Sequence, residues 1–217
     1  MLNSIAVGLL LAAAPLKKTI SWSPPPSTED DRPLISSIIA SAQDTDYVLT
    51  LELDKAPFGE ACQNHCVNAT VFLDTDNSKG TGLKLKDSKA PEAGADLAII
   101  VQAARAPGAG ARSDLKVRVM QFNEDATSLE QATELTELTL MRDGERVRVE
   151  GNTVSVRVDP NLGNQPAGAK MRVVYHPPDH APLVGMAPGL AAPSSGKLEL
   201  FKAGKRSKPS KSTSQSR

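Results

Sequence analysis

The sequence is poor in aromatic residues, and this limits what its core can be made of. Only 3% of the 217 residues are Phe, Trp or Tyr, whereas 40% are hydrophobic. A core of that composition has to be built from Val, Leu, Ile and Ala side chains. The chain also carries no net charge, with 25 basic and 25 acidic residues, so no overall field steers it toward a nucleic acid or a membrane.

Long apolar runs are lacking as well. The N-terminal run over residues 5–14 has a length typical of signal peptides and is too short to span a bilayer. Small residues end it, but no Lys or Arg precedes it and Pro15 follows directly, so a buried segment of the fold and a misplaced start codon are alternatives. The pattern predicts a signal peptide over residues 1–20, a secreted or periplasmic protein, and no transmembrane segment.

Proline separates this segment from the part that can fold. Residues 21–32 contain three consecutive prolines among Ser, Thr and acidic residues, which is typical of an extended linker. Residues 33–178 hold the strand signals. Residues 179–217 are a Pro/Gly-rich segment followed by a basic tail, which we expect to be disordered.

No long amphipathic helix is indicated within residues 33–178. Apolar and polar residues instead alternate with a period of two, which marks strands with one buried face. The clearest alternating runs are YVLTLEL, RVRVE, VSVRVD and MRVVYH, and ATVFLDTD, ADLAIIVQA and LKVRVMQF are further strand candidates. Residues 125–138 fit either a short helix or a strand in their second half. The sequence therefore predicts an all-β fold, an antiparallel β-sandwich of seven to nine strands with jelly-roll or immunoglobulin-like topology.

The connection after the strand VFLD is rich in oxygen ligands. Positions one, three, five and seven of a calcium loop are occupied by Asp74, Asp76, Ser78 and Gly80. An EF-hand also needs Gly at position six and Glu at position twelve, where this chain has Lys79 and Leu85, so the loop is not an EF-hand. A shorter calcium site remains, in which Asp96 or Asp87 completes the ligand set.

A purely structural turn explains the same residues. Asp and Asn side chains accept backbone N–H bonds in tight connections, and Gly80 and Gly82 supply positive φ angles. Catalysis by Asp74 and Asp76 needs a cleft that pushes their pKa values apart, and the sequence shows no second catalytic group beside them. We therefore expect no enzyme and no cofactor, with calcium as the candidate ion of this loop.

The segment ATVFLDTDNSKGTG…AGADLAIIVQ, centred on residues 71–101, resembles secreted β-sandwich domains of the DOMON and family-nine carbohydrate-binding-module type. In that pattern a strand ends in Asp-x-Asp, a Thr-Gly loop follows, and the next strand opens with Gly-Ala-Asp. The resemblance implies an extracytoplasmic sandwich that binds a sugar, haem or another ligand. This chain departs from the sugar-binding members because its domain has no Trp and only Tyr47 and Tyr175, and its His and Met residues show no spacing that favours haem ligation.

Two cysteines frame the segment CQNHC. In an oxidising compartment Cys62 and Cys66 are expected to form a disulfide. The alternative is a copper or zinc site made with His65, which the adjacency of His65 and Cys66 and the lack of a second cysteine pair disfavour.

Three functions follow from these patterns. The first is an exported, non-catalytic binding or cell-surface module with an unknown glycan, protein or cell-envelope partner. The second is a periplasmic metal or redox protein that uses Cys62, His65 and Cys66. The third is a calcium-stabilised accessory domain of glycan-active machinery, with Asp74, Asp76, Ser78 and Asp96 as ligands. The basic tail, residues 202–217, is expected to contact anionic surfaces, but specific nucleic-acid binding is not indicated.

Overall fold

A computed structural model of the chain describes residues 32–43, 46–58, 66–105, 113–159, 162, 170–178, 181–188 and 199–202. These residues form eleven β-strands and one 3-10 turn, and they contain no α-helix. The strands are β1 (Ile35–Gln43), β2 (Asp46–Leu53), β3 (Asn68–Asp74), β4 (Leu97–Arg105), β5 (Ser113–Gln121), β6 (Thr133–Thr139), β7 (Val147–Glu150), β8 (Thr153–Val158), β9 (Lys170–Tyr175), β10 (Leu183–Pro188) and β11 (Glu199–Lys202).

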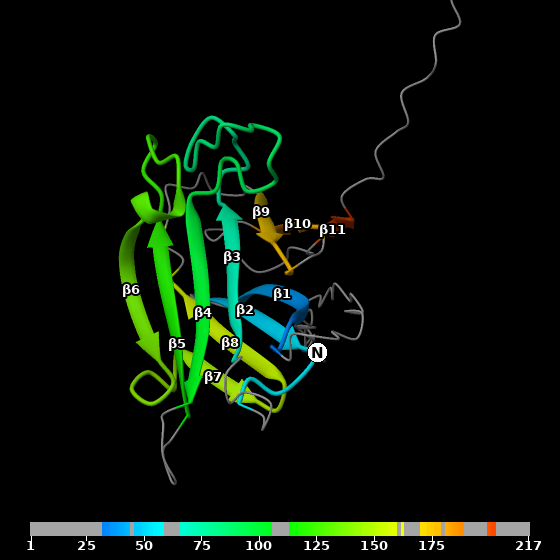
Figure 1. The fold of residues 1–217 in the computed structure, drawn as a ribbon, viewed down its shortest axis with the longest axis vertical. Coiled ribbons are helices and arrows are strands. Elements are labelled where there is room, and N and C mark those ends of the chain that lie inside the picture. Colours follow the sequence, from blue (N-terminus) through cyan, green and yellow to red (C-terminus); the bar gives the residue numbers. More distant parts are fainter. Residues whose placement is uncertain are drawn as a thin grey trace, which may run out of the picture.

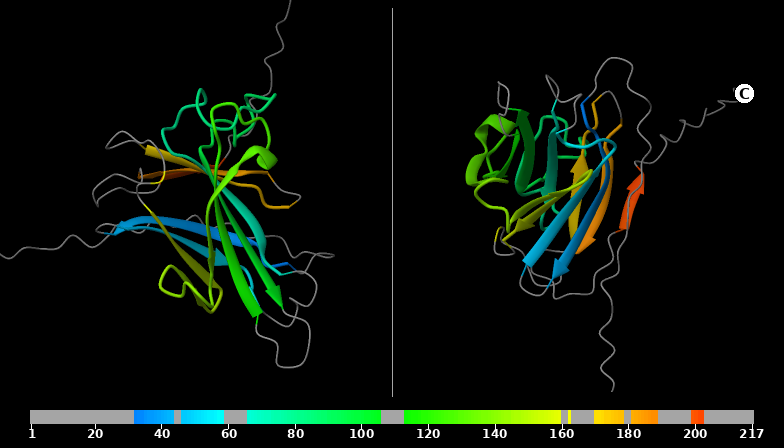
Figure 2. Two further views of the ribbon diagram at one scale, coloured as in Figure 1. Left: turned by 90° about the vertical axis from the view of Figure 1, so that its left-hand side faces the viewer. Right: turned by 90° about the horizontal axis from the view of Figure 1, so that it is seen from below.

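Two antiparallel sheets pack against each other, which confirms the expected all-β sandwich class. The smaller sheet has the order β1-β2-β8-β7, and the larger has the order β11-β10-β9-β3-β4-β5-β6. Figure 1 shows the strands of the smaller sheet crossing obliquely behind β3 to β6, and the turned views in Figure 2 show the two layers face to face.

The larger sheet continues past residue 178. Strand β10 pairs with β9, and β11 pairs with β10, although the sequence placed both strands in the segment after the domain. In the ambiguous stretch, residues 129–131 form the 3-10 turn and β6 follows it, so the strand alternative is correct for the second half.

The main core lies between the sheets and is almost wholly aliphatic, as the composition requires. It takes alternate apolar residues from β2, β4, β5 and β8, and all of these except partly buried Ala103 are at most 4% exposed. Tyr47, near the start of β2, is the exception among these aliphatic residues. Its phenol is completely buried in the core, and burial raises its pKa above the usual range.

A second apolar cluster covers the outer face of the larger sheet at one end. Phe72 and Phe122 stack there with ring centroids 6.4 Å apart, and Leu83 from the connection between β3 and β4 packs onto them. Both faces of β3 are therefore covered at its C-terminal end, where four consecutive residues are buried. This double coverage explains why the sequence VFLD is continuously apolar before its aspartate instead of alternating.

The β3–β4 connection, residues 75–96, closes on itself with the help of two glycines. Leu83 donates to the carbonyl of Ala95 at 2.8 Å, and Gly94 donates to the carbonyl of Leu83 at the same distance. A Cβ on Gly82 (φ +62°) would lie 2.2 Å from the Ala95 oxygen, and one on Gly94 (φ +90°) would lie 2.6 Å from the Ser78 oxygen. The backbone approaches itself so closely that these positions require glycine.

Candidate functional site

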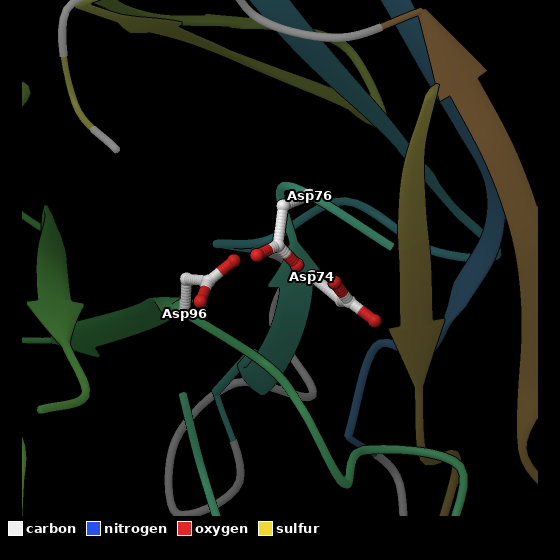
Figure 3. A group of neighbouring side chains, drawn as sticks. All are labelled: Asp74, Asp76 and Asp96. Carbon is white, nitrogen blue, oxygen red and sulfur yellow. The ribbon is translucent and has the colours of Figure 1, made fainter. Parts of the chain in front are cut away.

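Three neighbouring strands bring their polar ends together at one edge of the larger sheet. Leu73 at the end of β3 pairs with Leu97 at the start of β4, which pairs with Gln121 at the end of β5. The residues that follow β3, precede β4 and follow β5 therefore meet at this edge, at the top of Figure 1. Asp76 and Asp96, separated by twenty positions in the chain, are neighbours for this reason (Figure 3).

Asp96 is fixed mainly by Thr75. One carboxylate oxygen of Asp96 accepts the Thr75 backbone N–H at 2.7 Å and the Thr75 hydroxyl at 2.5 Å. The backbone of Asp96 joins the strands on either side, since its N–H donates to Leu73 and its carbonyl accepts from Phe122. Burial raises the pKa of Asp96, the two Thr75 bonds oppose the rise, and the nearby charge of Asp76 adds to it.

Asp76 folds the turn that follows β3. Its carboxylate accepts the Ser78 N–H at 2.8 Å and the Thr81 hydroxyl at 2.9 Å, as Asp does in tight turns. Asn77 between them has φ +55°, a left-handed conformation that Asn tolerates well. Asp76 therefore has the turn-forming hydrogen bonds that the structural explanation expects, but the positive φ angles belong to Asn77 and Gly82 and not to Gly80.

Asp74 has a different environment from the other two aspartates. Its side chain is 2% exposed, and one oxygen lies 2.6 Å from the Arg172 guanidinium on β9. The guanidinium N–H is not directed at that oxygen, so the contact is an ion pair without an aligned hydrogen bond. Arg172 also donates to the carbonyl of Ala93 at 2.5 Å, which ties the β3–β4 connection to β9.

The pKa of Asp74 reflects the competition between burial and this ion pair. The pKa of Asp74 is raised to about 6 because the rise caused by burial, the largest effect, exceeds the lowering by the charge of Arg172 and the N–H of Ser78. The charge of Asp96 and a contact with Asp76 raise it further. Arg172 thus offsets only part of the cost of placing this carboxylate in the sandwich.

A second contact anchors the same connection to the end of β9. The His176 ring lies 2.8 Å from the Glu92 carboxylate and packs edge-on against Phe72, with the ring centroids 6.2 Å apart. Together with Arg172, this contact holds the connection on the sheet, so the side chains it carries stand on a fixed frame.

Beside Asp76 and Asp96 the surface is hollowed into a cleft of about 370 Å3, which we call the aspartate cleft. It is lined by Thr75, Asp76, Thr81, Gly82, Asp96, Gln121, Phe122, Asn123 and Glu124. Among these described residues, three are carboxylates and none is Lys, Arg or His. Asp74 and Ser78 do not line the cleft.

The sequence named part of this site correctly. One oxygen each of Asp74, Asp76 and Asp96 lies within 4.8 Å of the other two, so the expected carboxylates do come together. Figure 3 shows Asp76 and Asp96 facing each other, with Asp74 directed toward β9. The Ser78 hydroxyl accepts from Gly80 within the turn, and Asp87 is exposed and bonded to the N–H of Lys89.

Two parts of the site were missed by sequence reasoning. The residues at the end of β5 and just after it, which include Gln121 and Glu124, gave no signal because their relation to Asp96 depends on strand pairing. Arg172 was visible as an arginine on the polar face of MRVVYH, but only the register of β9 against β3 places it opposite Asp74.

The cysteine segment cannot be compared in the same way. Cys62 and His65 lie outside the described residues, and Cys66 is half-buried just before β3. The disulfide and the Cys-His metal site therefore both stay predictions. The signal peptide and the role of the basic tail also stay predictions, since residues 1–20 and 203–217 lie outside the described ranges.

No known protein family, no curated protein and no solved structure matches this chain. The resemblance to DOMON and family-nine carbohydrate-binding domains stays a prediction. Within the part of the chain that the structure describes, there is no helix whose length and apolar character would let it cross a bilayer.

Proposed function

We propose that this protein is a non-catalytic binding module that works outside the cytoplasm and takes its ligand in the aspartate cleft. The observation that carries the proposal is a polar hollow of about 370 Å3, built from loop residues on a rigid sandwich. Ligand sites commonly have this size and this position on a scaffold. Export rests on the N-terminal apolar run and the family resemblance, and the partner is a glycan, a protein or a cell-envelope component.

The chemistry of the cleft favours binding over catalysis. Asp76 and Asp96 face each other, but Ser78, Thr81 and Thr75 hold their carboxylates by donated hydrogen bonds. Among the described residues that line the cleft, none offers an imidazole, thiol or amine that would act as a base or nucleophile. A pair of carboxylates engaged in a turn is suited to orienting a ligand rather than to transferring a proton.

A ligand screen that reports on the cleft tests the proposal. In the full chain, compounds of all charge classes should be titrated while the side-chain amide NMR signals of Gln121 and Asn123 are followed. A binding module should show saturable shifts of these two signals with at least one class, and Gln102, which lies outside the cleft on β4, should be unaffected. Saturable turnover of a substrate that stops in Asp96→Asn would refute the non-catalytic assignment.

Calcium is the second candidate, and one observation favours it. Oxygens of the three aspartates lie within 4.8 Å of one another, which is compatible with a shared cation. The fit is partial because Arg172 already supplies Asp74 with a positive charge, so a calcium ion would be held by Asp76 and Asp96 from the cleft side.

Calorimetry and thermal unfolding test calcium directly. If calcium binds, millimolar calcium chloride should raise the melting temperature of the full chain, and Asp96→Asn should abolish the rise. Magnesium serves as the matched control, because it prefers a smaller, more rigid octahedral site. An unchanged melting temperature at millimolar calcium would remove the ion from the proposal and leave the binding module untouched.

A further inference from the structure

We propose that the ligand of the aspartate cleft carries an organic cation, an alkylammonium or guanidinium group. The inference rests on the proposed binding function and names the class of its ligand. Three features of the cleft support it: its charge, its hydrogen-bonding capacity and its size.

The charge of the cleft is unbalanced on the side that a ligand would enter. Asp76, Asp96 and Glu124 line it, and no cationic side chain accompanies them among the lining residues. Arg172, the cation that contacts this aspartate group, is paired with Asp74 and with the Ala93 carbonyl, away from the cleft. A bound cation would supply the missing counter-charge where the carboxylates are partly desolvated and their attraction for it is strengthened.

The hydrogen-bonding capacity points the same way. The donors nearest to the two aspartates are already used: the Thr75 hydroxyl and N–H donate to Asp96, and the Thr81 hydroxyl donates to Asp76. The Asp76 N–H is a further donor to Asp96, and the Ser78 N–H is a further donor to Asp76. A carboxylate has about four acceptor sites, so three donors at Asp96 and two at Asp76 still leave unused lone pairs. The cleft therefore offers mainly acceptors, and a ligand rich in donors, such as an ammonium or guanidinium group, complements it.

The size of the hollow separates an organic cation from a bare metal ion. A volume of about 370 Å3 is more than ten times the roughly 30 Å3 that one water occupies in the liquid. An ion between Asp76 and Asp96 would leave most of the cleft to solvent, whereas an alkyl chain with a charged end reaches the carboxylates and still occupies the space beside Gln121 and Asn123.

Five-carbon compounds of matched length provide the test. Cadaverine, 1,5-pentanediol and glutarate differ only in their end groups, and each should be titrated into the full chain at low salt with a metal chelator present. We expect cadaverine alone to bind, with a dissociation constant in the millimolar range, and to shift the side-chain amide signals of Gln121 and Asn123. Added salt should weaken this binding, since the contacts are largely electrostatic.

Two charge-neutralising variants and one control locate the site. Glu124→Gln and Asp96→Asn should each weaken cadaverine binding by about fivefold, as expected for the loss of a partly exposed ion pair. Glu145→Gln removes the same charge from an exposed turn outside the cleft and should leave the affinity unchanged. Equal binding of the diol or the diacid, or cadaverine binding that both cleft variants retain, would overturn the inference.

Failure of the inference is distinguishable from failure of the proposed function. If a neutral or anionic compound shifts Gln121 and Asn123 while cadaverine does not, the cleft is a binding site for another ligand class and only the inference falls. If no compound of any charge shifts them, the cleft is not a ligand site and both fall.

The same chemistry has two sources, and one more variant separates them. Residues 202–217 of this chain contain six Lys or Arg and no acidic residue, so the ammonium group can come from the chain itself or from a partner. Lys205→Gln, Lys208→Gln and Lys211→Gln combined should tighten cadaverine binding if the tail competes for the cleft, and should leave it unchanged if the cation belongs to a partner. Both results retain the cation as the ligand class.

Discussion

Replacing Arg172 by methionine should destabilise the protein strongly at pH 8 and much less at pH 5. Methionine keeps a long apolar stem at a position whose side chain is 12% exposed, but it removes the positive charge that is paired with buried Asp74. Leaving one member of a buried ion pair without its partner costs about 3–5 kcal/mol of unfolding free energy. The hydrogen bond from Arg172 to the Ala93 carbonyl is lost at every pH and accounts for about 1 kcal/mol.

The pH dependence follows from the pKa of Asp74. In the native protein this pKa is raised from 3.8 to about 6, so the folded state binds a proton more tightly than the unfolded state does. The stability contributed by the protonated carboxyl is full below about pH 4 and is lost as the pH rises toward 6. Without Arg172 the folded pKa rises further, so the variant continues to lose stability above pH 6 while the native protein does not.

Urea denaturation followed by far-UV circular dichroism at pH 5 and pH 8 measures the effect. We expect a loss of about 1 kcal/mol at pH 5 and of about 3 kcal/mol or more at pH 8. Arg148→Met, on an exposed face of β7, is the control and should change stability little at either pH. Equal losses at the two pH values would refute the reasoning, because they would show that Arg172 acts through packing rather than through its charge.

Two further substitutions test the frame of the site and the edge of its sheet. Gly82→Ala should lower the unfolding free energy by about 3 kcal/mol or more, because the new Cβ would meet the Ala95 carbonyl at 2.2 Å. The control is Gly151→Ala, at a similar positive φ with no atom within 4 Å, which should cost only about 1–2 kcal/mol in the same urea titration. Equal costs of the two substitutions would contradict the close-approach argument. Arg142→Ala should change the unfolding free energy by no more than about 0.5 kcal/mol but increase aggregation measured by light scattering. The reason is that Arg142 donates a hydrogen bond of 2.7 Å to the Glu137 carbonyl on the edge of β6 and so blocks this edge. Unchanged scattering would show that the edge of β6 does not need this protection.

The strands that the sequence predicted are those whose alternation reports a single buried face. The runs at β2, β5 and β8 have that pattern, and the structure buries the apolar positions of each. β10 did not reveal itself because LVGMAP contains Gly185 and Pro188, which disfavour strands when judged alone. It forms because β9 offers an unpaired edge, and Pro188 stands at the last position, where a missing N–H is tolerated.

The site was predictable in its aspartates and not in their partners. Asp74, Asp76 and Asp96 stood out because acidic residues flanked two apolar runs, and antiparallel pairing of those runs brings their polar ends together. What separates Asp74 from the other two is the pairing of β9 with β3, a contact between residues 98 positions apart in the chain. Local sequence contains no information about that register, so the division of the cluster into one neutralised aspartate and two that face a cleft could come only from the structure.

That division bears on how binding and stability are coupled. The charge of Asp76 opposes ionisation of Asp96, and the positive charge of Arg172 is directed to Asp74. The hydrogen bonds that hold Asp76 and Asp96 come from the β3–β4 connection itself. The folded protein therefore carries an electrostatic cost at the cleft that a bound cation would remove. Because a ligand that binds only the folded state stabilises it in proportion to the logarithm of its concentration over its dissociation constant, the melting temperature should rise with cadaverine in the native protein. The rise should be smaller in Asp96→Asn, since that variant has already lost part of the repulsion that the cation relieves.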